Sequence, residues 1–207
     1  RVAWEGRTVD YGDATAMRSL RREMQVVFQD PFGSLDPRMT AGQAVGEALQ
    51  ALAGPVASVA AQDRIRTALS EVGLASAFAN RYPHEMSGGQ CQRVAIARAI
   101  VARPRLLVCD EAVSALDVSV QAQIVNLLHE LSERYQMSLL FISHNLAVVR
   151  HLCDDVAVLC QGRLVEQGSR DAIFGDPQTQ YTRDLLAAVP DPDPVRQRAR
   201  IAAAVGA

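Results

Sequence analysis

Two adjacent carboxylates, Asp110 and Glu111, directly follow the run Arg105–Cys109, whose last four residues are apolar. Such a run predicts a buried strand, and the ligand sites of α/β sheets lie at the carboxyl ends of strands. Because neighbouring residues on a strand point to opposite sides, one carboxylate can reach a magnesium shell while the other reaches an attacking water. An isolated Asp-Glu pair is often only a turn or cap, but the apolar run before this pair favours a hydrolytic site.

A small glycine-rich segment opens the predicted helix Gly89–Ala102. A helix N-terminus offers free N–H groups and a partial positive charge, and glycines let the backbone approach a phosphate closely. Taken alone, the segment is as consistent with a cap or loop as with a phosphate site. The sequence QRVAIARA after it and the carboxylate pair downstream favour phosphate binding. The segment consists of Ser87, Gly88, Gly89 and Gln90.

Two more polar residues follow predicted strands. Gln29 ends the predicted strand Glu23–Gln29, where a neutral amide can touch magnesium or water, although an ordinary strand end is the commoner role. His144 follows the predicted buried strand Ser138–Ile142. A lone histidine there is usually structural, but its place one strand along from Asp110 favours a functional role. The other histidines are expected to be surface or packing residues: His84, His129 and His151.

Composition restricts the possible functions. All 21 Lys+Arg residues are arginine, so these 207 residues cannot supply the phosphate-gripping lysine of a P-loop. The net charge of −2, with charges mixed along the chain, does not suggest a nucleic-acid binder. Apolar runs are far shorter than the roughly 20 residues of a membrane span. The cysteines lack metal-ligand spacing and are expected to be reduced, in or near a core: Cys91, Cys109, Cys153 and Cys160.

The elements that must position these residues alternate between strand and helix, which predicts an α/β fold with a largely parallel sheet. Residues 30–102 are predicted to form a helical insertion between strands, beginning with the loop Asp30–Arg38. Further strands are expected in the hairpin Val156–Cys160 and Arg163–Gln167, around Gln161-Gly162. The predicted helices are Thr40–Ala53, Gln62–Val72, a short one in Leu74–Glu85, Val118–Arg134, Leu146–Leu152, Arg170–Phe174 and Thr182–Ala188, before a tail from Pro190.

In this order, the motifs resemble the nucleotide-binding domain of ABC transporters, and the resemblance covers nearly the whole chain. Gln29 matches the Q-loop glutamine and Ser87–Gln90 the ABC signature, with Met86 where leucine is usual. Leu106–Asp110 matches Walker B and Glu111 the catalytic glutamate. The remaining matches are Ser114–Asp117 with the D-loop and His144 with the switch histidine.

The resemblance implies a P-loop NTPase-type ABC ATPase core, mostly parallel, with an inserted α-helical subdomain. In the family, Walker A lies shortly before the segment that begins here at Arg1. We therefore expect a fragment whose P-loop segment is missing and which, when isolated, binds ATP poorly and is inactive. The implied division is 1–29, a truncated part of the core ending in the Q-loop; 30–102, the helical subdomain with the signature; 103–175, the core with Walker B, D-loop and switch histidine; and 176–207, a peptide-importer-type extension.

Four longer segments resemble the dipeptide/oligopeptide importer subfamily, which also takes up nickel and glutathione. Two departures stand out: Cys91 replaces a usual arginine, and Thr179-Gln180 replaces a usual His-Pro. The segments are VFQDPFGSLDPRMT (Val27–Thr40), RYPHEMSGGQ (Arg81–Gln90), DEAVSALDVSVQAQI (Asp110–Ile124) and YTRDLLAAVPDPDP (Tyr181–Pro194).

The resemblance also implies a mechanism in which two nucleotide domains sandwich two ATP molecules. Asp110 then orients Mg²⁺, with Gln29 as a second contact. Glu111 polarises the water and His144 contacts the γ-phosphate. Gln29 also couples the site to the membrane subunit. Ser87–Gln90 and Asp117 meet the ATP of the other domain.

The implied partners are a second nucleotide-binding domain, two membrane permease subunits and an extracytoplasmic solute-binding protein, with no nucleic acid. The implied location is the inner face of the bacterial cytoplasmic membrane. Two alternatives remain: a non-catalytic ABC partner module, and an ABC-type DNA-maintenance ATPase. The latter usually carries long coiled coils or zinc modules, and the DPFGSLDP loop favours transport.

Overall fold

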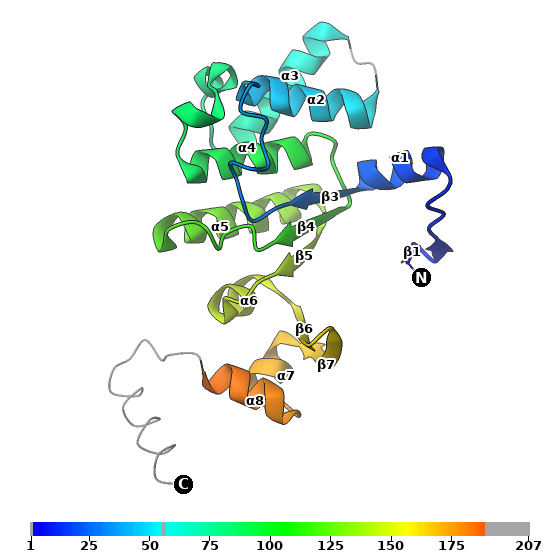
Figure 1. Cartoon of the computed structure of the whole chain (residues 1–207), viewed down its shortest axis with the longest axis vertical. Helices are drawn as coiled ribbons and strands as arrows, with labels where there is room; N and C mark the ends of the chain where they lie inside the picture. The colour runs from blue at the N-terminus through cyan, green and yellow to red at the C-terminus, as the bar shows by residue number, and fades with distance from the viewer. Residues whose placement is uncertain (1, 55–56, 189–207) are drawn as a thin grey trace. The chain divides into compact units, whose positions relative to one another are not determined.

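The computed structural model describes residues 2–54 and 57–188 (Figure 1), and these form two compact units, one up to His144 and one from Asn145. Each unit is described by itself. The predicted tail from Pro190 lies outside the described residues.

The first unit is built on a three-stranded parallel sheet in the order β3 (Met24–Val27), β4 (Leu106–Asp110), β5 (Ser138–Ile142). The register pairs Val27 with Cys109, Cys109 with Phe141, and Asp110 with Ile142. All three strands therefore end at the same edge of the sheet. The predicted parallel sheet is confirmed, although the first strand is shorter than expected.

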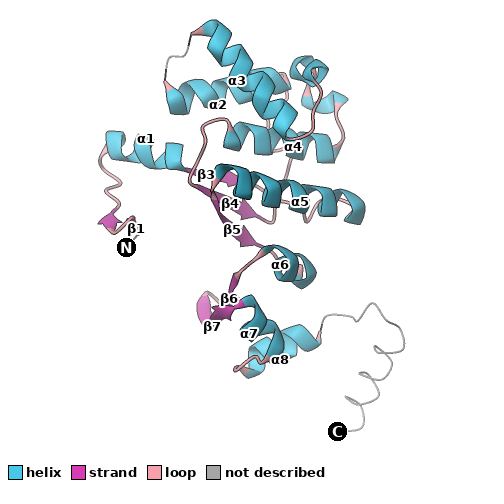
Figure 2. Ribbon diagram, turned by 180° about the vertical axis from the view of Figure 1, so that it is seen from behind, coloured by secondary structure: helices cyan, strands magenta, loops and turns pink. Residues whose placement is uncertain are grey.

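Helix α4 (Gly88–Ile100) lies between this sheet and a further group of helices (Figures 1 and 2). It contacts β3 and α5 (Val118–Tyr135), and it also contacts α2 (Ala41–Ala53) and α3 (Ser58–Glu71). Such double contact explains why most of α4 is apolar and buried. The fully buried large side chains of this core include Leu49, Leu69, Ile96, Ile100, Leu107, Ile124, Leu128 and Leu131.

Several predicted boundaries differ from those observed. Helix α3 begins at Ser58 rather than Gln62, and the short helix expected in Leu74–Glu85 is a pair of 3₁₀ helices. Pro83 starts the second of these, Pro83–Glu85, and the first is Ser76–Asn80. A proline has no N–H to donate, which suits the first position of a helical turn and interrupts a longer helix.

The first residues form a small hairpin of β1 (Ala3–Trp4) and β2 (Arg7–Thr8), and the helix α1 (Ala14–Glu23) follows it. The sequence analysis does not predict α1. Its N-terminal signal is present, because the Asp13 carboxylate accepts hydrogen bonds from the backbone N–H groups of Thr15 and Ala16.

Strands β4 and β5 are less buried than their apolar sequences predict. Along β4, Leu107 and Cys109 are fully buried while the alternate residues are partly exposed. On β5, Leu140 and Ile142 are 51% and 47% exposed. This alternation arises because the helical layer covers one face of the sheet and leaves the other face of the described strands largely open.

The second unit contains the antiparallel hairpin of β6 (Asp155–Cys160) and β7 (Arg163–Ser169), which confirms the predicted turn at Gln161-Gly162. The helices of this unit are α6 (Leu146–Leu152), α7 (Arg170–Gly175) and α8 (Gln180–Ala187). Helix α7 contacts both hairpin strands and carries the buried Ile173, and α8 contacts β7.

No single helix among residues 2–54 and 57–188 is long and apolar enough to cross a membrane. The pair α2 and α3 reaches the required length and hydropathy only when the two are taken together, and they are bent by 118° relative to each other.

Glu166 on β7 anchors the start of α8. Its carboxylate accepts hydrogen bonds from the backbone N–H groups of Gln178 and Thr179, at 2.7 and 3.1 Å, and from the Thr179 hydroxyl at 2.8 Å. The hydroxyl of Thr182, the backbone N–H of Gln178 and the Thr179 contacts lower the pKa of this carboxyl from 4.5 to about 2. Thr179, which stands where histidine is usual, therefore contributes both its N–H and its hydroxyl to this anchor.

We expect Glu166→Ala to loosen α8 from β7, because it removes the acceptor for these donors. Since the folded-state pKa is lowered, the stabilisation is present above about pH 4.5 and is lost as the pH falls towards 2. Hydrogen exchange of the Gln178 and Thr179 amides measures this loss. Glu130→Ala, at an exposed site on α5, is the control, and equal protection of these amides in all three proteins contradicts the anchor.

Candidate functional site

The carboxyl ends of the three parallel strands bring three predicted residues to one edge of the sheet. Asp110 is the last residue of β4, and His144 stands two residues after β5. Gln29 stands two residues after β3, so it lies in the following loop and is not the strand end predicted from sequence. All three side chains are exposed.

Glu111 lies outside the strand, in a turn. Its φ is +49°, a left-handed conformation that costs a residue other than glycine about 1 kcal/mol. The turn is held by its backbone N–H, which donates to the Ile142 carbonyl at 3.0 Å, and by Ser114, whose N–H and hydroxyl both donate to the Glu111 carbonyl at 3.0 Å. The predicted strand alternation of Asp110 and Glu111 is therefore wrong, because this turn, not the pleat, directs the Glu111 side chain.

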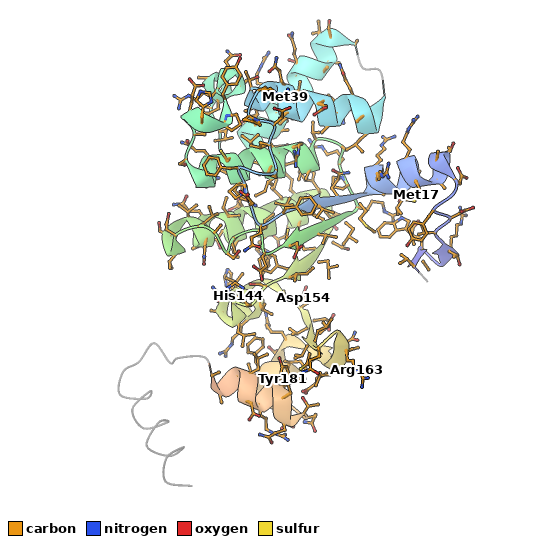
Figure 3. The ribbon with its side chains drawn as sticks, in the orientation of Figure 1. Met17, Met39, His144, Asp154, Arg163 and Tyr181 are labelled. Carbon is orange, nitrogen blue, oxygen red and sulfur yellow. The ribbon has the colours of Figure 1, made fainter. Side chains whose placement is uncertain are left out.

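The Glu111 carboxylate contacts His144, with Oε1 and Nδ1 3.2 Å apart. Because an ionised carboxylate only accepts hydrogen bonds, this contact requires the hydrogen of His144 on Nδ1. The Nε2 atom is then an acceptor in the neutral ring and a donor in the charged one. Figure 3 shows His144 directly after β5, and its side chain is 71% exposed, against 32% for Glu111.

The Asp110 carboxylate makes no hydrogen bond or ion pair with any residue that the structure describes, and no cluster of three metal-ligating side chains exists among those residues. Magnesium in nucleotide sites is typically held by one or two carboxylates together with phosphate oxygens and water. A single exposed carboxylate at the end of β4 fits that type of site.

Ser87 and Gln90 form a capping box at the start of α4. The Ser87 hydroxyl accepts from the Gln90 N–H at 3.3 Å, and the Gln90 side-chain oxygen accepts from the Ser87 N–H at 2.9 Å. This contact satisfies two of the N–H groups that a helix start leaves unpaired. It also fixes where the Ser87 hydroxyl lies relative to the helix.

The two glycines beside Ser87 have different surroundings. A Cβ atom on Gly89 would lie 2.6 Å from Cγ1 of Val120, in the first turn of α5. On Gly88 it would lie 3.6 Å from Leu116 and 3.7 Å from Phe32, which is ordinary contact. Gly89 is therefore required by the packing of α4 on α5, whereas Gly88 is not. Leu116 lies in the predicted D-loop segment Ser114–Asp117, whereas the sequence gives no signal for the contact of Val120 with Gly89, because an apolar residue on a helix does not indicate its neighbour.

Asp117 is the N-cap of α5. Its carboxylate accepts from the Ser119 hydroxyl at 2.7 Å and from the Val120 N–H at 3.0 Å, and these hydrogen bonds lower the pKa of the carboxyl. The described contacts of Asp117 are thus within its own helix.

Cys91, where arginine is expected, is fully buried. Its Sγ lies 3.6 Å from the Pro83 carbonyl, and burial raises the pKa of the thiol to about 11. The side chain therefore packs as a small neutral group. All four cysteines are free, and Cys109 is buried as well, as expected of reduced core cysteines.

Comparison with known families finds a match of residues 1–114 to the family described as ABC transporter. The oligopeptide transport ATP-binding protein OppF of Salmonella typhimurium is 46% identical over 198 residues, which is 96% of this chain and 59% of that protein. A putative peptide import ATP-binding protein of Brucella ovis is 49% identical over 94% of this chain and 61% of its own length. The chain thus spans about three fifths of the curated relatives it matches.

Solved structures give the same result. CbiO1 from Clostridium perfringens, part of the ABC transporter complex CbiONQ, superposes with a TM-score of 0.74 at 28% identity, over 84% of this chain and 67% of CbiO1. An ATP-binding cassette in a dimeric post-hydrolysis state, bound to ADP and Pi, gives a TM-score of 0.64, also at 28% identity, over 76% of this chain and 68% of that one. These similarities confirm the predicted fold class.

The steric difference between the glycines predicts different effects of the same substitution. Gly89→Ala forces α4 and α5 apart and is expected to cost about 1–3 kcal/mol of unfolding free energy. Gly88→Ala is the control and is expected to be neutral or slightly stabilising, since alanine favours helix. Thermal or urea unfolding measures both.

Adding Val120→Ala to Gly89→Ala is expected to recover part of the loss, because it removes the methyl group that the new Cβ meets. Equal losses for Gly88→Ala and Gly89→Ala, or no recovery in the double variant, contradict the packing explanation.

Proposed function

This chain belongs to the ABC transporter family, and we propose that it is part of an ATP-binding subunit that hydrolyses ATP to drive uptake of peptides or a related small solute. Its fold is that of an ABC ATPase core of the P-loop NTPase type. The observation that carries the proposal is the contact between Glu111 and His144, at the sheet edge that also presents Asp110.

The proposed chemistry follows from these positions. Glu111 orients the water that attacks the γ-phosphate or accepts a proton from it. This is the usual role of a carboxylate next to an attacking water. His144 holds that carboxylate through its Nδ1–H, and in the charged form of the ring its Nε2–H donates to the γ-phosphate oxygens. Asp110, with Gln29 from the neighbouring loop, would hold a magnesium ion, which would neutralise phosphate charge there.

The phosphates also need donors that this chain does not contain, since it has no lysine. We propose that the ATP lies between two such domains, and that Ser87–Gln90 reaches the nucleotide held by the second domain. The start of α4 suits this role because the positive end of a helix attracts phosphate oxygens. The dimeric relative bound to ADP and Pi supports a two-domain arrangement.

The substrate class rests on the relatives, several of which are named for oligopeptide or peptide import. We infer that this subunit works with two permease subunits and an extracytoplasmic solute-binding protein, at the inner face of the cytoplasmic membrane.

A cavity of about 720 Å³ between α2, α3 and the first 3₁₀ helix is the proposed contact for a permease segment. It opens beside Arg38–Thr40, at the end of the loop that follows Gln29.

Glu111→Gln in the full-length protein is expected to lower ATP turnover at least about a hundredfold while ATP still binds, because the amide cannot take up a proton. Steady-state phosphate release and nucleotide binding measure the two steps. Glu130→Gln, an exposed glutamate on α5, is the control and should leave both unchanged. Unchanged turnover in Glu111→Gln contradicts the proposed role and favours a non-catalytic partner module.

Gln50→Trp fills the cavity with a large side chain and is expected to lower solute uptake by more than about tenfold while ATP hydrolysis by the detached subunit continues. Gln50→Ala is the matched control, since Gln50 is exposed and its truncation leaves the cavity open. Uptake and ATPase rates in reconstituted vesicles separate the two effects, and normal uptake with Gln50→Trp rules out this contact.

A further inference from the structure

We propose that Val120 is a positioning residue for the segment Ser87–Gln90, and that it acts in this way on the ATP site of the partner domain rather than on its own. The proposal rests on the proposed function, in which this segment meets the nucleotide of the second domain. It adds a residue outside the recognised motifs to the machinery of that site.

The first step is the contact itself. The methyl carbon Cγ1 of Val120 occupies the place where a side chain on Gly89 would begin, 2.6 Å from the position of its Cβ. Valine has a branched Cβ and one strongly preferred rotamer in a helix, and glycine has no side chain to adjust. The contact therefore joins two rigid groups, so a change in the size of residue 120 is transmitted to the backbone of Gly89.

The second step is the fixed position of Val120. The Asp117 carboxylate accepts its N–H at 3.0 Å, and the Gln121 side-chain amide donates to the Leu116 carbonyl at 3.0 Å. These bonds hold the first turn of α5 and the residues before it as one piece. Leu116, on the other side of Asp117, lies beside Gly88. Gly88 thus lies against Leu116 and Gly89 against Val120, one residue before and three residues after Asp117.

The third step links this surface to Ser87. The capping box ties Ser87 to Gln90, on either side of the two glycines, so the Ser87 hydroxyl moves with the start of α4. Small displacements matter here, because positioning errors of about 1 Å can cost a catalytic site two orders of magnitude in rate. Val120 lies on α5, and its N–H donates to Asp117 rather than to Glu111 or His144, so its effect is expected in the partner's site.

The test uses full-length protein assembled into two mixed complexes, each with one hydrolytic site. In the first, a domain with Val120→Ala faces a domain with Glu111→Gln, so the working site uses an unaltered Ser87–Gln90 segment. In the second, one domain carries both changes and faces a wild-type domain, so the working site uses the loosened segment. We expect phosphate release at the rate of the wild-type/Glu111→Gln complex in the first, and about tenfold slower in the second.

A second measurement does not need hydrolysis. In the Glu111→Gln background, adding Val120→Ala is expected to weaken ATP-dependent association of the two domains about tenfold, while ATP affinity of the separate domain stays the same. Val120→Thr, which keeps the branched shape, is expected to restore both rate and association.

The matched control is Val125→Ala, five residues further along α5. It removes the same two methyl groups from a side chain only 3% exposed, and so reproduces a general loss of packing. Equal losses in both mixed complexes, a loss reproduced by Val125→Ala, or no loss in either measurement overturns the role of Val120. Absence of ATP hydrolysis in the wild-type complex overturns the proposed function instead.

Discussion

The hydrogen bond from the Glu111 N–H to the Ile142 carbonyl joins the two strands that carry the site. Parallel pairing already sets Asp110 opposite Ile142, and this bond extends the pairing by one residue into the turn. Glu111 is thereby held in a left-handed conformation against Ile142, which stands two residues before His144, and the side chains of Glu111 and His144 meet at 3.2 Å. The site depends on the register of β4 with β5, since a slip of one residue would separate this pair.

The same sheet also sets the position of the helical layer. Because α4 ends at Ile100 and β4 begins at Leu106, the start of α4 must lie towards the edge where the strands end. The contact of Gly89 with Val120 then holds that start against α5, which follows the carboxylate turn in sequence. Two consecutive connections of the chain thus place the segment Ser87–Gln90 and the carboxylates towards the same edge of the sheet while keeping them on separate elements.

Periodicity and motif order predicted the parallel sheet, the long helix α5 and the hairpin β6–β7. They also identified both Glu111 and His144 as candidate site residues. They did not predict α1, although an aspartate at position 13 is a typical N-cap residue. They failed for the direction of Glu111, because strand alternation stops where a residue enters a left-handed turn. They also overstated the burial of Leu140 and Ile142, since an apolar run does not show how many faces of its strand other elements cover.

The two glycines of Ser87–Gln90 show why such a motif has more than one physical cause. Close approach of a ligand to the backbone and close approach of another helix both require glycine, and the sequence looks the same in either case. Here the neighbouring helix accounts for Gly89, whereas the described chain leaves room for a Cβ on Gly88. A glycine that its own chain does not require is consistent with a surface that meets a ligand or partner. In this motif, Gly89 therefore lets α4 pack closely against α5, and Gly88 leaves the surface of Ser87–Gln90 free of a side chain.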